Sequence, residues 1–249
     1  IIYDNVKVES KDFRNKGSLI VHAHTGFSGD ERPYIPGSSV KGAMLTGLMV
    51  QAARSSVRNF KPSDLNKIYD VVSKPQLKVK GMNRTITYSY AFGRAFRFSD
   101  FMPVGEYKLS IMTIERKRGA SSKGGIPNVG VFLTSGKFEG ELDYDAEEMR
   151  TFLDLFKNDD SHQWPFPFEG FFRDIDTVKK ALDEMIEGIK YIDQNWAQIP
   201  DVHNGNPIIT LGRYRGAKAM AISNFIGKRV NTMWYTQNGD RPGLIILKG

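Results

Sequence analysis

The 249-residue sequence contains no cysteine. This absence excludes disulfide bonds and thiolate metal sites, and it suits a protein of a reducing compartment, so we expect a cytoplasmic protein. The sequence also lacks any apolar run of the roughly 18 to 20 residues that a membrane-spanning helix requires. We therefore expect a protein that has no membrane partner.

Several signatures of catalysis are missing as well. A mononucleotide-binding loop needs Gly-x4-Gly-Lys-Ser/Thr, whereas the glycine- and serine-rich turn at 33–42 continues with Ala43 and Met44. The sequence holds neither a nucleophile elbow nor a His-Glu-x-x-His motif. His22 and His24 would share one face of a strand, as a general acid and base or as metal ligands, but no third ligand stands at a recognisable spacing. The sequence thus predicts neither a metal site nor a cofactor.

Positive charge is in excess, and it is unevenly distributed. The net charge of +7 divides into +9 for residues 1–144, −8 for residues 145–204 and +6 for residues 205–249. Basic segments attract nucleic-acid phosphates, whereas an acidic helical segment is more typical of a surface that faces solvent or a protein partner. The charge pattern therefore favours a nucleic-acid-binding protein with a separate acidic segment.

The turn PYIPGSSVKG at 33–42 leads directly into a segment whose apolar residues recur at helical spacing. Glycines let backbone amides approach a ligand, serines can cap a helix or donate hydroxyls, and a lysine adds positive charge beside the helix dipole. The alternative is a turn that serves only as an N-cap. The residues predicted to hold phosphates are Gly37, Ser38, Ser39, Lys41, Gly42 and, on the polar side of the helix, Arg54.

Alternating apolar residues predict short strands at 19–24, 107–115 and 137–144. Between the last two lies RKRGASSKGG at 116–125, which is too polar and too rich in glycine to pack internally. We expect a mobile basic loop there, the alternative being a hairpin connection without a function. Its candidate RNA contacts are Arg116, Lys117, Arg118 and Lys123.

The acidic segment predicts two amphipathic helices. The first follows an apparent capping box at 145–148 and carries the apolar stripe Met149, Phe152, Leu153 and Phe156. The second begins near Asp176. Core packing explains both stripes better than a cofactor would.

A second glycine cluster, LGRYRGAK at 211–218, follows a strand-like run at 207–211. Guanidinium groups pair with phosphates, tyrosine can stack on a base, and glycine permits close approach of the backbone. The candidate RNA contacts here are Gly212, Arg213, Arg215 and Lys218.

The turn at 33–42 resembles the Pro-x-Ile-Pro-Gly-Ser-Ser-hydrophobic-Lys-Gly signature of the RAMP superfamily, the RNA-binding subunits of type III CRISPR effector complexes. The strand end RAFRFSD at 94–100 resembles that of the Csm-type subunit that caps the 3′ end of the guide RNA, and the order of later elements agrees with it over most of the chain. One departure is Phe101, which stands where a second serine is usual. A related Cmr-type subunit is the alternative.

The resemblance implies an α+β fold, with a ferredoxin-like (RRM-like) RAMP core, a β-hairpin thumb formed by the basic loop and an added helical segment. Residues 1–144 would form the core with the first glycine-rich loop and the thumb, 145–204 the acidic helical segment, and 205–249 the C-terminal strands that complete the core. The implied partners are guide RNA (crRNA), target RNA and other RAMP subunits. Because phosphate contacts carry little sequence information, we expect binding that tolerates any guide sequence and weakens steeply with salt.

The resemblance also raises the question of RNA cleavage. Backbone RAMP subunits cleave target RNA with an acidic residue in the loop before the Pro-Gly-Ser-Ser signature, and Asp30 lies roughly there. A single carboxylate before a turn is far more often a solvated loop residue. We therefore expect a non-catalytic subunit, with a metal-dependent endoribonuclease as the alternative.

Overall fold

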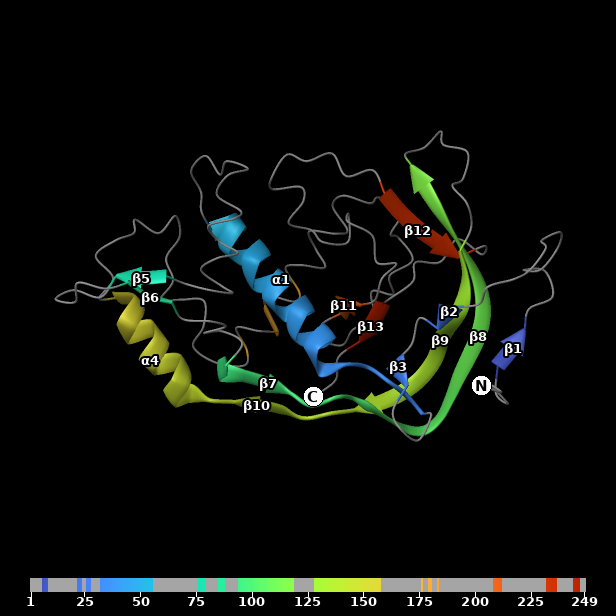
Figure 1. Ribbon diagram of the computed structural model, residues 1–249, viewed down its shortest axis with the longest axis horizontal. Coiled ribbons are helices and arrows are strands. Elements are labelled where there is room, and N and C mark those ends of the chain that lie inside the picture. The colour runs from blue at the N-terminus through green and yellow to red at the C-terminus, as the bar shows by residue number, and fades with distance from the viewer. Residues whose placement is uncertain are drawn as a thin grey trace.

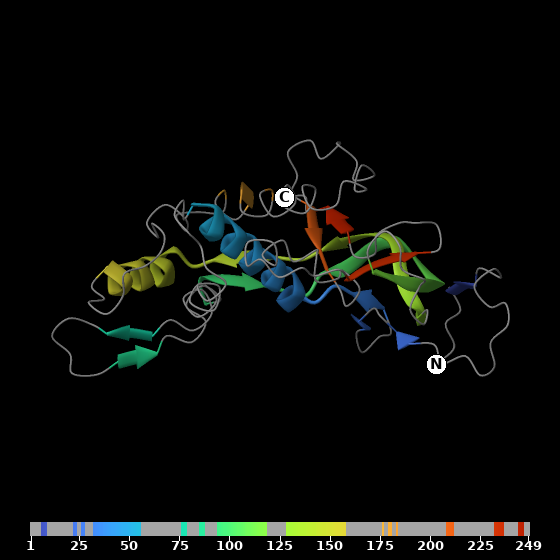
Figure 2. The ribbon, with the colours of Figure 1, turned by 90° about the horizontal axis from the view of Figure 1, so that it is seen from above.

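The structure is a computed structural model, and it describes residues 6–8, 22–23, 26–27, 32–55, 76–78, 85–87, 94–118, 128–157, 176, 179–180, 183, 208–211, 232–236 and 244–246. The described elements form an elongated molecule in both views, with helix α4 (Ala146–Lys157) near one end and strand β1 (Val6–Val8) at the other (Figures 1 and 2). Helix α1 (Gly37–Ser55) crosses the middle of the molecule, between α4 and the largest sheet.

The largest sheet is built around two long strands. β8 (Met102–Arg118) and β9 (Asn128–Glu139) pair in antiparallel fashion, and β12 (Thr232–Thr236) pairs antiparallel with the end of β8. β1 joins β8 and β2 (His22–Ala23) joins β9, both in parallel. This sheet buries the aliphatic side chains Leu109, Ile114, Val129 and Val131.

Among the described residues, four two-stranded pairs accompany this sheet, and all four are antiparallel. They pair β10 (Leu142–Tyr144) with β7 (Phe96–Phe98), β11 (Ile208–Thr210) with β13 (Leu244–Ile246), β3 (Gly26–Phe27) with β4 (Pro33–Tyr34), and β5 (Gln76–Lys78) with β6 (Thr85–Thr87). The expected mixture of helices and strands is thus confirmed. The ferredoxin-like core, the thumb and the three-part domain division stay predictions.

Helix α1 lies against β7 and β11. Its buried residues Val40, Ala43 and Met44 recur at the spacing of one helix face, and Met44 belongs to the apolar residues whose spacing predicted this helix. Thr46 is also buried, and its hydroxyl donates a hydrogen bond of 2.8 Å to the carbonyl oxygen of Gly42 one turn earlier, which satisfies the polar group within the helix.

The β8–β9 ladder changes register twice. Pro103 pairs with Phe138 and Tyr107 pairs with Gly136, so the three residues 104–106 of β8 lie opposite a single residue of β9. Gly105 in this bulge has a φ of +78°, and 44% of the surface of Val104 is exposed. One step further along, β9 carries the extra residue Thr134, whose hydroxyl donates to the carbonyl oxygen of Lys108 at 3.1 Å.

Two strand predictions need correction. The segment 116–118, which the sequence assigned to the basic loop, continues β8, because β12 pairs with it residue for residue from Ile114 to Arg118. The strand predicted at 137–144 is divided into β9 and β10 by Gly140 and Glu141. A Cβ atom on Gly140 would lie 2.7 Å from the Phe101 ring, so the chain passes Phe101 at a distance that only glycine allows. The rest of the predicted loop, with Lys123, lies outside the described residues.

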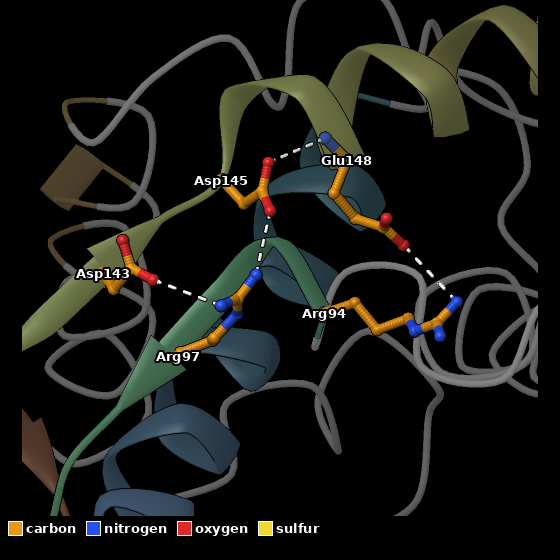
Figure 3. A network of polar contacts seen from close by, with 5 residues as sticks. All are labelled: Arg94, Arg97, Asp143, Asp145 and Glu148. Carbon is orange, nitrogen blue, oxygen red and sulfur yellow. Dashed lines mark hydrogen bonds and ion pairs between the residues drawn. The ribbon is translucent and has the colours of Figure 1, made fainter.

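The start of α4 confirms half of the predicted capping box. The carboxylate of Asp145 accepts a hydrogen bond of 2.9 Å from the amide of Glu148. Its other oxygen accepts one of 2.8 Å from Arg97 on β7, and the Glu148 carboxylate faces Arg94 rather than the amide of Asp145 (Figure 3). The amide of Asp145 instead donates to the carbonyl of Ala95. The predicted core role is confirmed for Met149 and Phe152, which are fully buried.

The second predicted helix is described at four positions. Asp176, Lys179, Lys180 and Asp183 are helical and exposed. Within the described part of the chain, no helix combines the length and apolar character needed to cross a membrane.

Candidate nucleic-acid interface

The predicted phosphate-binding turn lies at the N-terminus of α1, as expected, but the helix begins earlier than a serine cap would require. Gly37 is already helical, and the carbonyl oxygen of Pro36 accepts hydrogen bonds from the amides of Ser39 at 2.9 Å and Val40 at 3.3 Å. Ser38 and Ser39 therefore lie inside the first turn, and the expectation that they cap the helix is wrong.

The cap comes from a distant part of the chain. The amide of Gly37 donates a hydrogen bond of 2.9 Å to the carboxylate of Asp100, 63 residues later. A carboxylate at this place is favoured by the helix dipole. Asp100, which lies two residues after the end of β7, therefore completes the turn at 33–42 that the sequence singled out.

Backbone packing explains why position 37 is glycine. A Cβ atom there would overlap the carbonyl oxygen of Ser99 and would lie 2.6 Å from that of Phe98. Ile35 and Phe101 also exchange two backbone hydrogen bonds, of 3.0 and 2.9 Å, beside this contact. The start of α1 is therefore fixed to the end of β7 by backbone atoms.

The strand end is in turn fixed to the segment before β10. Ser99 donates its amide to the carbonyl of Glu141 at 3.0 Å, and the Ser99 hydroxyl accepts from the amide of Glu141 at 2.8 Å. That hydroxyl also donates to the carbonyl of Asp100 at 3.2 Å. Three chain segments that are far apart in the sequence thus meet at the N-terminus of α1.

The first turns of α1 present an open side. Ser38 and Gly42 are exposed and lie four residues apart, so they share one helix face. A Cβ atom on Gly42 would meet nothing within 4 Å, which means that packing within the described structure does not require glycine there. Glycine in a helix interior costs about 1 kcal/mol relative to alanine, so Gly42 is a position where the fold itself would favour another residue.

Lys41 lies beside this open side and is half-buried. Burial removes water from its ammonium group and lowers the pKa of Lys41 below the ordinary value for lysine. A phosphate close to the ammonium group would favour its charged form and raise the pKa again. A bound anion would therefore offset the cost that burial places on the Lys41 charge.

The remaining predicted contacts fall on less completely described parts of the chain. Arg54 lies in the last turn of α1, and Arg116, Lys117 and Arg118 lie in β8, where they pair with Trp234, Met233 and Thr232 of β12. Lys123, Gly212, Arg213, Arg215, Lys218, Asp30 and His24 lie outside the described residues. Among the predicted contacts that the structure describes, it therefore brings together Gly37, Ser38, Ser39, Lys41 and Gly42. Over the described residues, no group of three or more histidine, aspartate or glutamate residues could hold a metal ion.

Asp100 is the residue of this site that the turn at 33–42 does not reveal. It lies in the strand end at 94–100, which the sequence singled out, but nothing in the local sequence says which amide its carboxylate accepts from. Arg94 and Arg97, on the same strand end, are exposed cations, but their guanidinium groups face Glu148, Asp143 and Asp145 (Figure 3).

Two solved structures are similar in fold. A chain of the cryo-EM structure of a Csm–crRNA–target RNA ternary complex of a type III-A CRISPR-Cas system matches with a TM-score of 0.58 and 18% identity, covering 93% of this chain and 78% of that one. The crystal structure of T. onnurineus Csm5 matches with a TM-score of 0.53 and 19% identity, covering 92% and 77%.

A search of curated protein sequences found no match. The model of the RAMP superfamily matches residues 18–196, which include α1 with its glycine-rich start, the strand end at Asp100 and the β8–β9 ladder. Since this match spans more than half of the sequence, the chain belongs to the RAMP superfamily.

Proposed function

We propose that this chain is a non-catalytic, guide-RNA-binding subunit of a type III CRISPR RNA-targeting ribonucleoprotein, and that it holds the guide near its 3′ end. Its partners would be guide RNA, target RNA and other RAMP subunits. The likeness in fold to a Csm chain and to Csm5 supports the type of complex. The resemblance of the strand end at 94–100 to the subunit that caps the guide supports the 3′ position.

The observation that carries the proposal is the open start of α1. Ser38 and Gly42 leave one side of the first turns uncovered, and Lys41 adds a half-buried positive charge beside them. This combination suits a sugar–phosphate backbone, because a hydroxyl can donate to phosphate, a missing side chain permits close approach and a cation offsets the negative charge. None of these groups distinguishes one base from another, so the site fits an RNA of any sequence.

Other parts of the chain would extend this contact. Arg213, Arg215 and Lys218, in the second glycine cluster, would hold an adjacent phosphate. The basic segment from Arg116 to Lys123 would follow the RNA strand. The excess of positive charge on either side of the acidic segment supports this distribution of contacts.

The first test is copurification of the tagged chain from its native host under mild salt, with sequencing of the bound RNA and mass spectrometry of the bound proteins. The proposal expects short guide RNAs with repeat-derived ends together with other RAMP subunits. A chain that carries neither would overturn it. Asp30→Ala, assayed for target cleavage in the same preparation, should leave both RNA binding and cleavage unchanged if the chain is not the nuclease.

A second test addresses the position along the guide. Guides with a single 4-thiouridine near the 3′ end or near the 5′ end are assembled into the complex and crosslinked by ultraviolet light. We expect this chain to crosslink to the 3′-labelled guide. Crosslinking to the 5′-labelled guide alone would retain an RNA-binding subunit but would place it at the other end of the guide.

A further inference from the structure

The N-terminus of α1 already holds a negative charge. The amides at the start of a helix form a ready site for anions, because they point away from the helix and carry the positive end of its dipole. Here the Asp100 carboxylate accepts from the first of these amides, that of Gly37, at 2.9 Å. A phosphate that approached along the helix axis would therefore meet a carboxylate rather than a vacant amide.

Asp100 is held on both sides by other contacts. Phe101, the next residue, exchanges two backbone hydrogen bonds with Ile35, and Ser99, the preceding residue, is fixed to Glu141 by two further bonds. The carbonyl oxygen of Ser99 also lies against Gly37 with no room for a Cβ atom between them. These contacts fix the backbone of Asp100 and thereby hold its exposed carboxylate within reach of the Gly37 amide.

The side of α1 that carries Ser38 and Gly42 offers that alternative place. Both residues are exposed, and a Cβ atom on Gly42 would meet no atom of the described residues outside its own stretch of helix within 4 Å. The two glycines of the turn therefore differ in their surroundings. Gly37 packs against the strand end, whereas a Cβ atom on Gly42 would contact none of the described residues outside its own stretch of helix.

We propose that Asp100 is a positioning residue for RNA, which excludes phosphate from the N-terminus of α1 and directs the RNA backbone to the side formed by Ser38 and Gly42. This proposal rests on the proposed RNA-binding function. It assigns to Asp100 two separable effects: its oxygen holds the Gly37 amide, and its charge repels phosphate from that amide.

The charge effect is tested with Asp100→Asn, because asparagine keeps an oxygen that can accept from the Gly37 amide while the charge is removed. The matched control is Glu106→Gln, which makes the same change in net charge at an exposed position of the β8 bulge. Binding of a labelled single-stranded RNA is measured from about 50 to 300 mM salt. At the lowest salt we expect about threefold to tenfold tighter binding for Asp100→Asn and less than about twofold for Glu106→Gln, with the difference lost at high salt. Equal effects of the two changes would overturn the proposal.

The exclusion effect is tested without RNA, so that it does not depend on the proposed function. Selective 15N-glycine labelling of the full chain follows the Gly37 amide signal by NMR during titration with inorganic phosphate. We expect the signal to stay in place in the wild type and to shift in Asp100→Ala. A shift in the wild type, or no shift in either protein, would overturn the exclusion. If Asp100→Ala does not fold, the wild-type titration still decides, since a shifting Gly37 signal contradicts the proposal and a stationary one supports it.

The two readouts separate the possible failures. If the chain binds no RNA, but its Gly37 signal responds to phosphate only after the Asp100→Ala change, the proposed function is rejected and the exclusion of phosphate is retained. A chain that binds RNA while its Gly37 amide responds to phosphate would retain the function and reject the exclusion.

Discussion

Gly37 and Ser99 approach so closely that the carbonyl oxygen of Ser99 occupies the place of a Cβ atom on residue 37. This contact joins the glycine-rich turn to the strand end through backbone atoms, which cannot rotate away as a side chain can. The consequence is that the two glycines of one signature, Gly37 and Gly42, differ in what they do for the fold.

Gly37→Ala and Gly42→Ala should therefore change stability in opposite directions. The Gly37 change forces backbone apart and should cost about 1 to 3 kcal/mol. The Gly42 change adds a methyl group in open space and improves helix propensity, so it should gain about 0.5 to 1 kcal/mol. Urea unfolding followed by circular dichroism measures both. A loss of stability in Gly42→Ala would show that its surroundings are closed.

Gly42→Ala should also weaken RNA binding while the fold becomes more stable, because the added methyl group stands where the RNA backbone would approach. Filter binding with a labelled single-stranded RNA, at the salt where the wild type is half saturated, measures the change. Ala146→Gly, which makes the reverse exchange at an exposed residue of α4, is the control and should leave RNA affinity unchanged. Unaltered affinity in Gly42→Ala would remove Gly42 from the interface.

The half-buried Lys41 predicts a pH dependence of stability. Because burial lowers its pKa in the folded state, the unfolded chain binds more protons than the folded chain between that lowered pKa and the unfolded value of about 10.4. The contribution of Lys41 to stability therefore rises with pH through this window. Lys41→Met should remove this rise, measured as the difference in urea midpoint from the wild type at each pH. Lys108→Met, at an exposed position on β8, should leave the profile unchanged.

The same substitution should reveal whether Lys41 contacts phosphate. Lys41→Met should reduce the slope of log affinity against log salt by about one, as expected for the loss of one cationic contact. A bound phosphate should also raise the pKa of Lys41, so RNA binding near the lowered pKa should take up protons. Calorimetry in two buffers with different ionisation enthalpies detects this uptake, and an uptake that persists in Lys41→Met would assign it to another group.

Asp145 and Asp143 provide a matched pair for the start of α4. Asp145 accepts both the Glu148 amide and Arg97, so Asp145→Ala should cost about 1 kcal/mol through the lost cap. The Asp143 carboxylate forms an exposed ion pair with Arg97 at 3.5 Å, so Asp143→Ala should cost about 0.5 kcal/mol or less. Urea midpoints with and without added salt distinguish the two, since only the Asp143 effect should disappear with salt.

Gly140 and Phe101 should be coupled in stability. Gly140→Ala places a Cβ atom 2.7 Å from the base of the Phe101 ring, which should cost about 1 to 3 kcal/mol. In a Phe101→Ala background the ring is gone, and the same change should cost little. A double-mutant cycle measures the difference, for which we expect a coupling energy of about 1 kcal/mol or more. Additive effects would show that the ring moves aside without cost.

The elements that the sequence predicts best are those whose determinants are local. The apolar spacing after the glycine-rich turn predicted α1, and Asp145 followed by acidic residues predicted the start of α4, because both patterns lie within one or two helical turns. Alternation predicted the middle of β8 for the same reason. These local signals also led to the correct location of the candidate site at the N-terminus of α1.

The corrections all involve partners that are distant in the sequence. Arg116 to Arg118 have the composition of a loop, but pairing with β12, more than a hundred residues later, satisfies their backbone groups in a strand. Ser38 and Ser39 have the composition of helix caps, but Asp100 takes that role from 63 residues away. Local composition predicts the secondary structure or capping role that a segment would prefer in isolation. Here hydrogen bonds to partners that are distant in the sequence override that preference in the folded chain.

The register shifts between β8 and β9 bear on how this protein tolerates changes in length. In a regular ladder, one inserted or deleted residue turns every following side chain to the opposite face, and the buried apolar Leu109 and Ile114 would then exchange places with their polar neighbours Ser110 and Thr113. At Val104 to Glu106 the strand already carries unpaired residues in an exposed bulge, so a length change there can be absorbed before the buried stretch begins. Homologous chains should accordingly differ in length at this bulge more readily than in the regularly paired stretch from Leu109 to Ile114.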